Sequence, residues 1–222
     1  MRTRFALIPI LALILMSASG ALAQSRRGEL RGVWIGAGRD RDWPAIMQSL
    51  RDNGFNAVFA NFTVGNMALY PSKVLAVAPD GDTNRDELSE AAQAARANGI
   101  ELHVWRVNWA LQQTPKDLLD RLEAEGRLQR DAKGQLARAN PYAKVDWLCP
   151  SHPENRALEK EAMLELARDY DVAGIHFDYM RFPGGDYCFC DGCKERFQEI
   201  IGATVKAWPD NVLGDGPLAG EG

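Results

Sequence analysis

The stretch that most constrains the fold of this chain is residues 171–183, DVAGIHFDYMRFP. It begins as a short apolar run that suits a strand buried on both faces, and it then presents Asp178 and Arg181 before Pro183, which cannot join a strand ladder. In parallel α/β sheets, ligands bind and reactions occur at the carboxyl ends of the strands. The stretch therefore predicts that Asp178 is a catalytic carboxylate. The alternative is that Asp178 caps the following loop or pairs with Arg181.

Strand-like and helix-like segments alternate along the chain. Asp42 is placed to cap the first helix, and Ser151 with Glu154 forms a capping box before the helix that precedes residues 171–183. This alternation predicts an α/β fold with parallel strands joined by right-handed crossovers. The strand-like runs are residues 30–35, 55–62, 100–107 and 171–178, and the helix-like segments are about residues 43–53, 85–98, 115–125, 154–169 and 194–201.

The long connections of this order follow strands. Residues 63–83 come after the second strand, and residues 127–150, with a turn at 131–134, lie between the third and fourth strands. A (β/α) barrel builds its active site from such loops, on the face that carries the strand carboxyl ends. A closed barrel needs eight βα units and this chain shows about four. We therefore expect the N-terminal half of a TIM-type barrel, with a small open sheet as the alternative.

The first residues have the composition of a secretory signal peptide. Arg2 and Arg4 precede an apolar run that is too short to span a bilayer, and a small-residue motif offers a cleavage site after Ala23. We therefore expect a periplasmic or secreted protein with no membrane span after cleavage. The expected division of the chain is a signal peptide over residues 1–23, one (β/α) domain over residues 24–206 and an irregular tail over residues 207–222.

The charge balance argues against a nucleic-acid-binding protein. Lysine and arginine number 26 against 30 aspartate and glutamate residues, which gives a net charge of −4 at pH 7. Nucleic-acid-binding proteins instead carry a basic surface. A dinucleotide is not expected either, because Gly36 and Gly38 after the first strand lack the third glycine of the phosphate-binding loop. We expect no organic cofactor.

Four cysteines could hold a metal ion or form two disulfides. An exported protein favours disulfides, but three of the four lie within residues 188–193, where any pairing makes a very small, strained ring. Four thiolates from two segments could instead surround a zinc ion tetrahedrally. The spacing therefore favours a structural zinc site over two disulfides. The four ligands would be Cys149, Cys188, Cys190 and Cys193.

Motifs at the predicted strand ends form a pattern that covers residues 28–205. They are RGVW at 31–34, YPS at 70–72, Trp105 and Asn108 at the end of the third strand, LCPS at 148–151 and GIHFDYMRFP at 174–183. The pattern resembles the family-ten glycosyl-hydrolase-like proteins, secreted or envelope glycosidases on a TIM barrel, one of which is associated with cleaving peptidoglycan glycan strands. The resemblance implies a glycoside hydrolase that acts on a polysaccharide, with Asp178 as nucleophile or charge stabiliser.

A second catalytic carboxylate is not evident. Glycoside hydrolysis generally needs two carboxyl groups that flank the scissile bond. Asp186 is near Asp178 but on a loop, and Glu101 falls at the wrong end of its strand. Family members continue through strands five to eight, whereas this chain stops at Gly222, so we expect the second carboxylate in the missing C-terminal half of the barrel. The alternative is a carbohydrate-binding or inactive fragment.

Aromatic and hydrogen-bonding side chains on the predicted strands are candidates for binding the saccharide. Flat indole and phenol rings suit sugar faces, while amide, imidazole and guanidinium groups bind hydroxyls or a carboxylate. For each ring, the alternative is ordinary packing in the core. The candidates are Trp34, Asn61, Trp105, Asn108, His176, Tyr179 and Arg181.

Overall fold

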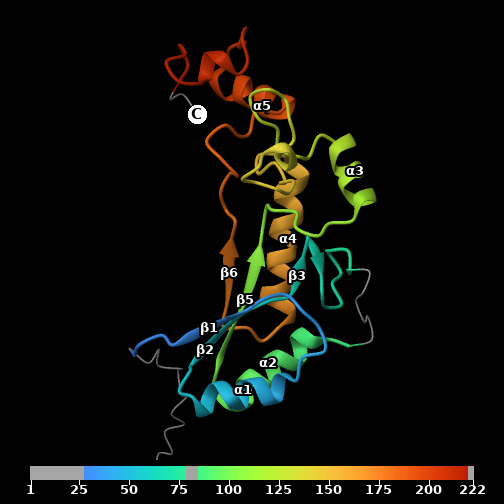
Figure 1. Cartoon of the computed structure of the whole chain (residues 1–222), viewed down its shortest axis with the longest axis vertical. Coiled ribbons are helices and arrows are strands. Elements are labelled where there is room, and N and C mark those ends of the chain that lie inside the picture. Colours follow the sequence, from blue (N-terminus) through green and yellow to red (C-terminus); the bar gives the residue numbers. More distant parts are fainter. Residues whose placement is uncertain (1–27, 79–84, 220–222) are drawn as a thin grey trace, which may run out of the picture.

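A four-stranded parallel sheet forms the centre of the protein, in a computed structural model that describes residues 28–78 and 85–219. The predicted signal peptide lies outside these residues. The strand order is β1-β2-β5-β6, so each strand pairs with the next long strand of the chain, as in successive units of a barrel (Figure 1). The strands are β1 (Gly32–Ile35), β2 (Ala57–Asn61), β5 (Glu101–Val107) and β6 (Gly174–Asp178).

The register of the sheet shifts at its last strand. Ala57 pairs with Glu101, the first residue of β5, but Gly174 at the start of β6 pairs with His103. β6 therefore begins two residues further along β5, and Asp178 lies opposite Val107, the last residue of that strand. A stagger of this kind is what lets parallel strands tilt and curve into a barrel.

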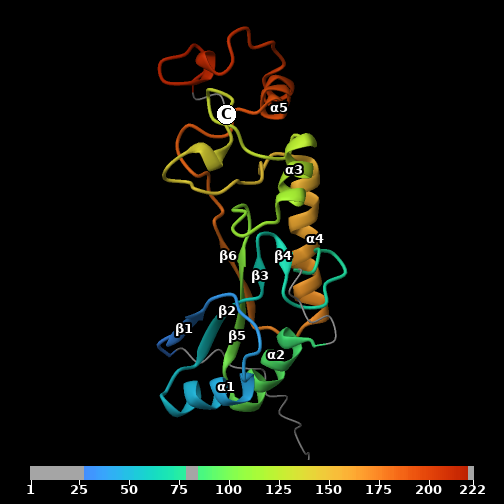
Figure 2. The same cartoon turned by 45° about the vertical axis from the view of Figure 1, so that its right-hand side comes forward.

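Three helices cover one face of the sheet, which we call the outer face (Figures 1 and 2). Their apolar side chains pack on Val58, Leu102 and Val104 to form the main core. The predicted cap of the first helix is confirmed, because Asp42 Oδ1 accepts a hydrogen bond from the Ala45 N–H at 3.0 Å. The three helices are α1 (Trp43–Asp52), α2 (Glu87–Asn98) and α4 (Pro153–Asp169).

The predicted capping box of α4 is wrong. The residue that caps this helix is His152, and its side chain makes no capping hydrogen bond. The Ser151 hydroxyl instead lies 3.2 Å from the Cys149 sulfur and accepts a hydrogen bond from Arg196 Nη2 at 2.9 Å. Ser151 is thus engaged with the cysteine cluster, a tertiary contact that the local sequence pattern does not reveal.

The opposite, inner face of the sheet is open. Rings from all four strands line it, and the exposed fraction of Trp34 is 50%. We predicted that the fourth strand would be buried on both faces. This is wrong, because β6 is the edge of the sheet and Phe177, on its outer face, is 54% exposed.

The loops beyond the strand carboxyl ends contain short elements of their own. The turn predicted at 131–134 is confirmed by a 3.0 Å hydrogen bond from the Gly134 N–H to the Asp131 carbonyl. In both views α5 lies beyond the sheet and not against it (Figures 1 and 2), so it does not take the place of a fourth barrel helix. These elements are β3 (Thr63–Val64), β4 (Met67–Ala68), α3 (Lys116–Ala124), η1 (Ala137–Ala139), α5 (Asp191–Ile201) and η2 (Asp210–Val212).

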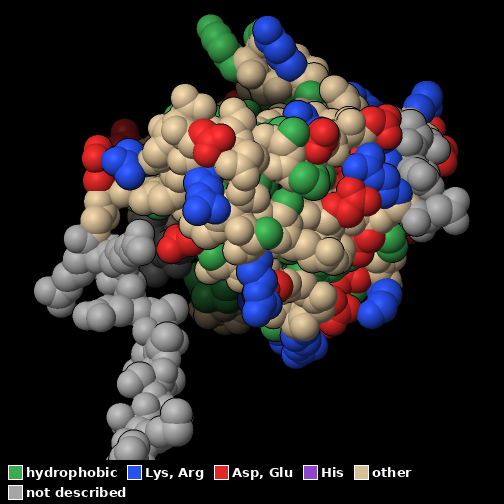
Figure 3. All heavy atoms as spheres, turned by 90° about the horizontal axis from the view of Figure 1, so that it is seen from below, with side chains coloured by type: hydrophobic (Ala, Val, Ile, Leu, Met, Phe, Trp, Pro, Cys, Tyr) green, Lys and Arg blue, Asp and Glu red, His purple; other side chains and the backbone are tan. Residues whose placement is uncertain are grey.

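The surface at the α1 and α2 end carries charges of both signs. In Figure 3, acidic and basic side chains alternate over this end without a continuous basic patch. That face therefore does not have the character of a nucleic-acid-binding surface. Over residues 28–78 and 85–219, no helix has the length and apolar composition needed to cross a membrane.

Candidate active site

Asp178 ends β6 at the carboxyl edge of the sheet. Strand pairing continues up to this residue, because the Asn108 N–H donates to the Asp178 carbonyl oxygen at 3.0 Å. The side chain is half-buried. It lies on the inner face, because side chains two residues apart in a strand share a face and His176, the partner of Trp105, lies on that face. Asp178 thus has the position that catalytic carboxylates occupy in barrel enzymes.

Two N–H groups hold the Asp178 carboxylate. Trp105 Nε1–H donates to Oδ2 at 2.9 Å, and the Tyr179 backbone N–H donates to Oδ1 at 2.7 Å. Tyr179 has a φ of 55°, a left-handed conformation that is uncommon for an aromatic residue. Unusual backbone conformations of this kind concentrate at functional sites. Each carboxylate oxygen therefore has a fixed donor, and the group is oriented before any substrate arrives.

Arg181 does not pair with Asp178. Its guanidinium carbon lies 5.3 Å from the centre of the Trp147 ring and 5.0 Å from the centre of the Tyr179 ring. The two rings are themselves in contact, with centroids 5.2 Å apart. The structure therefore does not contain the Arg181 ion pair. The other alternative, that Asp178 caps the following loop, is met in part, because its Oδ1 accepts a hydrogen bond from the Tyr179 N–H. Trp147 was not among the predicted site residues, although it lies close before Cys149 in the sequence.

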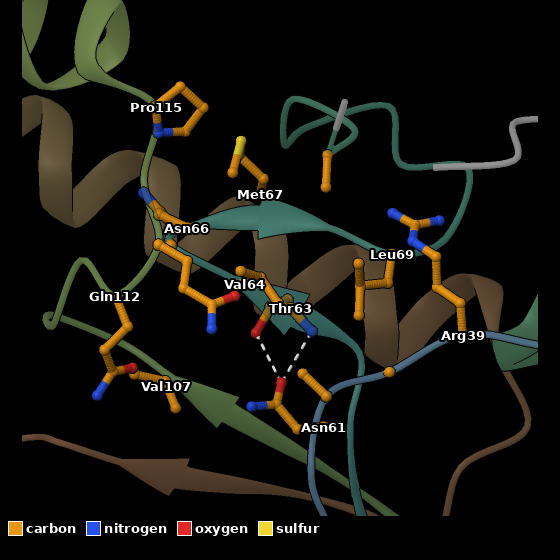
Figure 4. A pocket seen from close by; sticks show the side chains of 15 residues that line it. Arg39, Asn61, Thr63, Val64, Asn66, Met67, Leu69, Val107, Gln112 and Pro115 are labelled. Atoms are coloured by element: carbon orange, nitrogen blue, oxygen red, sulfur yellow. Dashed lines mark hydrogen bonds between the residues drawn. The ribbon is translucent and has the colours of Figure 1, made fainter. Parts of the chain in front are cut away.

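A cavity of about 710 Å³ opens over the carboxyl ends of β1, β2 and β5 (Figure 4). Asn61 lies in its wall, where its side-chain oxygen accepts hydrogen bonds from the Thr63 N–H at 2.8 Å and the Thr63 hydroxyl at 3.0 Å. Val107, the strand partner of Asp178, also lines it. None of the described residues that line the cavity carries a carboxylate. Asp178 itself is not among these residues, so the cavity is a space for a ligand at the same end of the sheet that reaches Asp178 only through its strand partner Val107.

The inner face of the sheet carries a layer of rings beneath this site. Trp34 stacks on Phe59, with centroids 4.8 Å apart, and meets Trp105 and His176 edge-on at 5.0 Å and 4.7 Å. Three of the predicted saccharide-binding residues, Trp34, Trp105 and His176, are thus brought together. Their rings contact one another, so each has a packing role as well as an exposed edge.

Asn108 faces the other side of the sheet. Its side chain is fully buried, and its Nδ2 donates to Glu159 Oε2 on α4 at 2.8 Å. Glu159 also forms a buried ion pair with Arg106, which in turn donates to Asn66. The saccharide-binding role of Asn108 stays a prediction, but its amide serves a buried polar network behind the site. An arginine between Trp105 and Val107 in the strand was the sequence signal for this network.

The YPS motif at 70–72 is a structural clamp. The Ser72 hydroxyl donates to Glu165 Oε2 at 2.5 Å, and the Lys73 N–H donates to Glu165 Oε1 at 2.6 Å. The Tyr70 hydroxyl donates to the same carboxylate, and burial together with the Glu165 charge raises the pKa of Tyr70. The motif therefore attaches the loop after β4 to α4 on the outer side of the sheet.

The two other carboxylates considered from the sequence lie where expected. Glu101 is the first residue of β5, at the end of the sheet opposite to Asp178, and it lies 3.4 Å from His103. Asp186 is exposed on the loop after β6. Neither of them lines the cavity over the carboxyl ends of β1, β2 and β5.

The four cysteines converge in the loops beyond the sheet. The sulfur atoms of Cys149, Cys188, Cys190 and Cys193 all lie within 4.8 Å of one another, and none is in a disulfide. Cys149 precedes α4 and the other three surround the start of α5, so the cluster joins two segments that are distant in the sequence. Sulfur atoms at this separation are close enough to surround one metal ion.

The cluster favours thiolate formation at one sulfur. Hydrogen bonds from Cys188, then from Cys190 and Cys193, hold the pKa of Cys149 well below that of an ordinary thiol. Arg196 Nη2 also points at the Cys149 sulfur, at 3.9 Å. The same contacts with Cys149 raise the pKa of Cys188 and Cys190. Cys149 is therefore the sulfur best prepared to bind a cation, because the thiolate is the form that binds metals.

Comparison with known proteins identifies the family. The model of the family described as glycosyl hydrolase-like 10 matches residues 29–187. An S-layer-related protein of Niallia circulans is 32% identical over 151 residues, which are 60% of this chain and 9% of that protein. Glycosyl hydrolase YngK of Bacillus subtilis (strain 168) is 25% identical over 189 residues, which are 73% of this chain and 35% of that protein. The match therefore covers about a tenth of the length of the first of these relatives and about a third of the second.

Solved structures share the fold. An α-L-fucosidase isoenzyme 2 from Paenibacillus thiaminolyticus matches with a TM-score of 0.63 and 20% identity, over 79% of this chain and 26% of that chain. A hypothetical protein from Ruminiclostridium thermocellum matches with a TM-score of 0.50 and 18% identity, over 77% of this chain and 87% of that chain. The predicted fold class, a partial (β/α) barrel of about four units, is confirmed. With a family model that covers well over half of its length, the chain belongs to the glycosyl hydrolase-like 10 family.

Proposed function

We propose that this protein is an exported glycoside hydrolase that cleaves O-glycosidic bonds of a polysaccharide, with Asp178 as a catalytic carboxylate. The observation that carries the proposal is the carboxylate itself. It ends a parallel strand on the open face of the sheet, and two N–H donors orient it. Its strand partner Val107 lines a cavity of about 710 Å³ at the same end of the sheet. Family membership and the barrel-type fold support the same reaction class.

The hydrogen bonds suit Asp178 to the role of nucleophile or charge stabiliser. Both of its oxygens accept hydrogen bonds, and both donors are N–H groups that cannot take up a proton. Such a carboxylate is best used in its charged form, against the positive charge that develops on the sugar. The proton for the leaving group then has to come from a second acid. A separation of about 5 to 5.5 Å between the two would predict retention of configuration, and about 6.5 to 9.5 Å would predict inversion.

We further propose that the substrate is the glycan of peptidoglycan and that the protein works in the periplasm or outside the cell. Support comes from the motif resemblance and from the predicted signal peptide at residues 1–23. The rival proposal is a carbohydrate-binding or inactive protein. It is favoured by the absence of a second carboxylate among the described residues that line the cavity.

We also propose that the four-cysteine cluster holds one structural zinc ion. The donor set fits zinc, because four thiolates in tetrahedral array form closed sites with no position left for a substrate. The distances between the sulfur atoms fit as well, since all lie within 4.8 Å. The cysteines would fasten the segment before α4 to the start of α5. No catalytic step depends on this ion.

The release of new reducing ends from purified glycan strands tests the proposal. We expect cleavage by the protein and none by Asp178→Asn, with the melting temperature nearly unchanged because Asp178 forms no ion pair with the described residues. Asp186→Asn is the control, because its exposed loop carboxylate should be dispensable. Retained cleavage in Asp178→Asn would remove Asp178 from the mechanism. Glycan binding without cleavage by the wild-type protein would favour the rival proposal.

A further inference from the structure

The Ser151 hydroxyl lies within hydrogen-bonding distance of both the cysteine cluster and the guanidinium of Arg196. Its oxygen is 3.2 Å from the Cys149 sulfur and 3.1 Å from the Cys193 sulfur. The same oxygen accepts hydrogen bonds from Arg196 Nε at 3.2 Å and from Arg196 Nη2 at 2.9 Å. A hydroxyl has one proton to donate and two lone pairs that accept. Because Arg196 uses both lone pairs, the proton of Ser151 is left to donate to one of the two sulfurs.

Arg196 also brings a positive charge to the cluster. Its Nη2 lies 3.9 Å from the Cys149 sulfur, and it forms no ion pair with a carboxylate of the described residues. Within residues 28–78 and 85–219, no other lysine or arginine side chain hydrogen-bonds to one of the four sulfurs. Arg196 is on α5 and Ser151 lies just before α4, so the two residues come from the same segments as the cysteines. They form a second link between these segments.

The second residue of α5, Gly192, leaves space for the guanidinium. A methyl group on Gly192 would lie 2.9 Å from both Nη1 and Nη2 of Arg196. A side chain there would therefore push the guanidinium away from its place beside Ser151. The φ angle of Gly192 is not positive, so the helix itself does not require a glycine at this position. The missing side chain thus serves the position of Arg196.

We propose that Ser151 and Arg196 are positioning residues for the metal ion of the cysteine cluster, and that together they stabilise its negative charge. This inference rests on the proposed zinc site and goes beyond its four ligands. Four thiolates carry more negative charge than a divalent ion neutralises, and burying the excess is costly without donors or an opposite charge. Ser151 donates to a sulfur, while Arg196 holds Ser151 in place and opposes the charge. Groups that act on metal ligands in this way change metal affinity about 10- to 100-fold.

Titration of the reduced protein with cobalt(II) and then with zinc tests the inference. We expect Ser151→Ala and Arg196→Gln each to weaken the binding of both ions about tenfold or more, measured in competition with a chelator. Ser151→Thr, which keeps the hydroxyl, should retain most of the affinity. Loss of the hydrogen bond raises the energy of the sulfur electrons, so the thiolate-to-cobalt absorption band of Ser151→Ala should move to longer wavelength. A merely structural role for Ser151 would leave that band unchanged.

Gly192→Ala gives the sharper comparison. Alanine favours a helix more than glycine does, so this variant should keep or raise the melting temperature of the metal-free protein. It should nevertheless displace Arg196 and weaken cobalt binding about as much as Arg196→Gln does. Gly185→Ala is the matched glycine control, because its methyl group would meet nothing within 4 Å. Arg156→Gln is the charge control, because this exposed arginine lines the same 520 Å³ cleft as Arg196 and hydrogen-bonds to no sulfur. Both controls should leave the affinity nearly unchanged.

The two residues should act as one unit. Because Arg196 acts in part through Ser151, the double variant of Ser151→Ala and Arg196→Gln should lose less affinity than the product of the two single losses. Losses that multiply would show that the residues act independently, which would overturn the role of Arg196 in holding Ser151.

The outcomes separate this inference from the proposed zinc site. Reduced wild-type protein that binds neither cobalt nor zinc would overturn both. Wild-type protein that binds metal, together with Ser151→Ala and Arg196→Gln that bind it equally well, would overturn only this inference and leave the four-cysteine site standing. Unchanged affinity in Gly192→Ala would show that the place of the guanidinium does not matter, which also overturns the role of Arg196.

Discussion

At the scale of single residues, Trp105 is the side chain that couples the ring layer to the proposed chemistry. Its indole edge meets Trp34, and its Nε1–H donates to Asp178 Oδ2. Replacement by phenylalanine keeps most of the apolar surface but removes the donor. The carboxylate should then lose one of the two groups that orient it.

We therefore expect Trp105→Phe to lower kcat about tenfold or more, with little change in KM. The size follows from the worth of a hydrogen bond to a charged group, about 1.5 to 3 kcal/mol. Steady-state kinetics on glycan strands measures it. Trp208→Phe is the control, because it also removes an indole donor, here to the Phe189 carbonyl, but far from Asp178 in the chain. Equal losses in both variants would point to a general effect on stability.

At the scale of elements, the cysteine cluster should hold the loops in a fixed conformation, whereas the sheet should not depend on it. We expect about one zinc ion per chain in protein purified without chelator. Loss of one ligand in Cys149→Ser should increase amide hydrogen exchange over residues 127–150 and 179–193, while β1, β2 and β5 keep their protection. Metal analysis and hydrogen exchange read by mass spectrometry measure both effects. Protein without zinc whose mass shows two disulfides would exclude the site.

The ion pair between β5 and α4 should contribute strongly to stability. Arg106 is fully buried and Glu159 is 2% exposed. Glu159→Gln would leave the Arg106 charge buried without its partner, a change that costs about 3 to 5 kcal/mol. Urea unfolding measures the loss. Glu161→Gln, on an exposed position of the same helix, should cost less than about 0.5 kcal/mol.

Regular elements could be predicted where local chemistry decides them. Asp42 caps α1, and Gly99 ends α2 with a φ of 65°, because capping acts within a few residues. The hairpin of β3 and β4 was missed, since strands of two residues are too short to show an alternating pattern. The sequence also could not show that the Ser151 hydroxyl belongs to the cysteine cluster, because its partner Arg196 is distant in the chain.

The candidate site was predictable only in part for a similar reason. Asp178 follows from its place at the end of an apolar run, and the structure adds its donors Trp105 and Tyr179. The direction in which Asn108 points depends on Glu159, a residue of α4 that only the packed structure brings near. The role of Trp147 beneath Arg181 likewise arises from two segments that meet in space.

At the scale of the whole molecule, the open inner face should make the chain associate. Helices cover the outer face, but Trp34 on the inner face is half exposed beside Phe59 and His176. Exposed aromatic surface of this kind tends to pair or aggregate. We expect residues 24–222 to associate through this face and to be poorly stable as a monomer.

Size-exclusion chromatography over a range of concentrations measures this association. Trp34→Ser should shift the protein towards monomer, whereas Tyr142→Ser should not, although Tyr142 is 91% exposed on a loop. A cooperatively melting monomer over the whole range of concentrations would contradict the prediction.

Two glycines of the ring layer have a consequence for reading natural and laboratory variants. A methyl group on Gly32 would lie 2.6 Å from the Phe59 ring, and one on Gly174 would lie 2.7 Å from the His103 ring. Scoring schemes treat glycine-to-alanine exchange in a strand as mild or even favourable. At these two positions the added methyl would displace a neighbouring ring. A deep mutational scan should therefore show that alanine at either position is as damaging as the loss of an aromatic side chain.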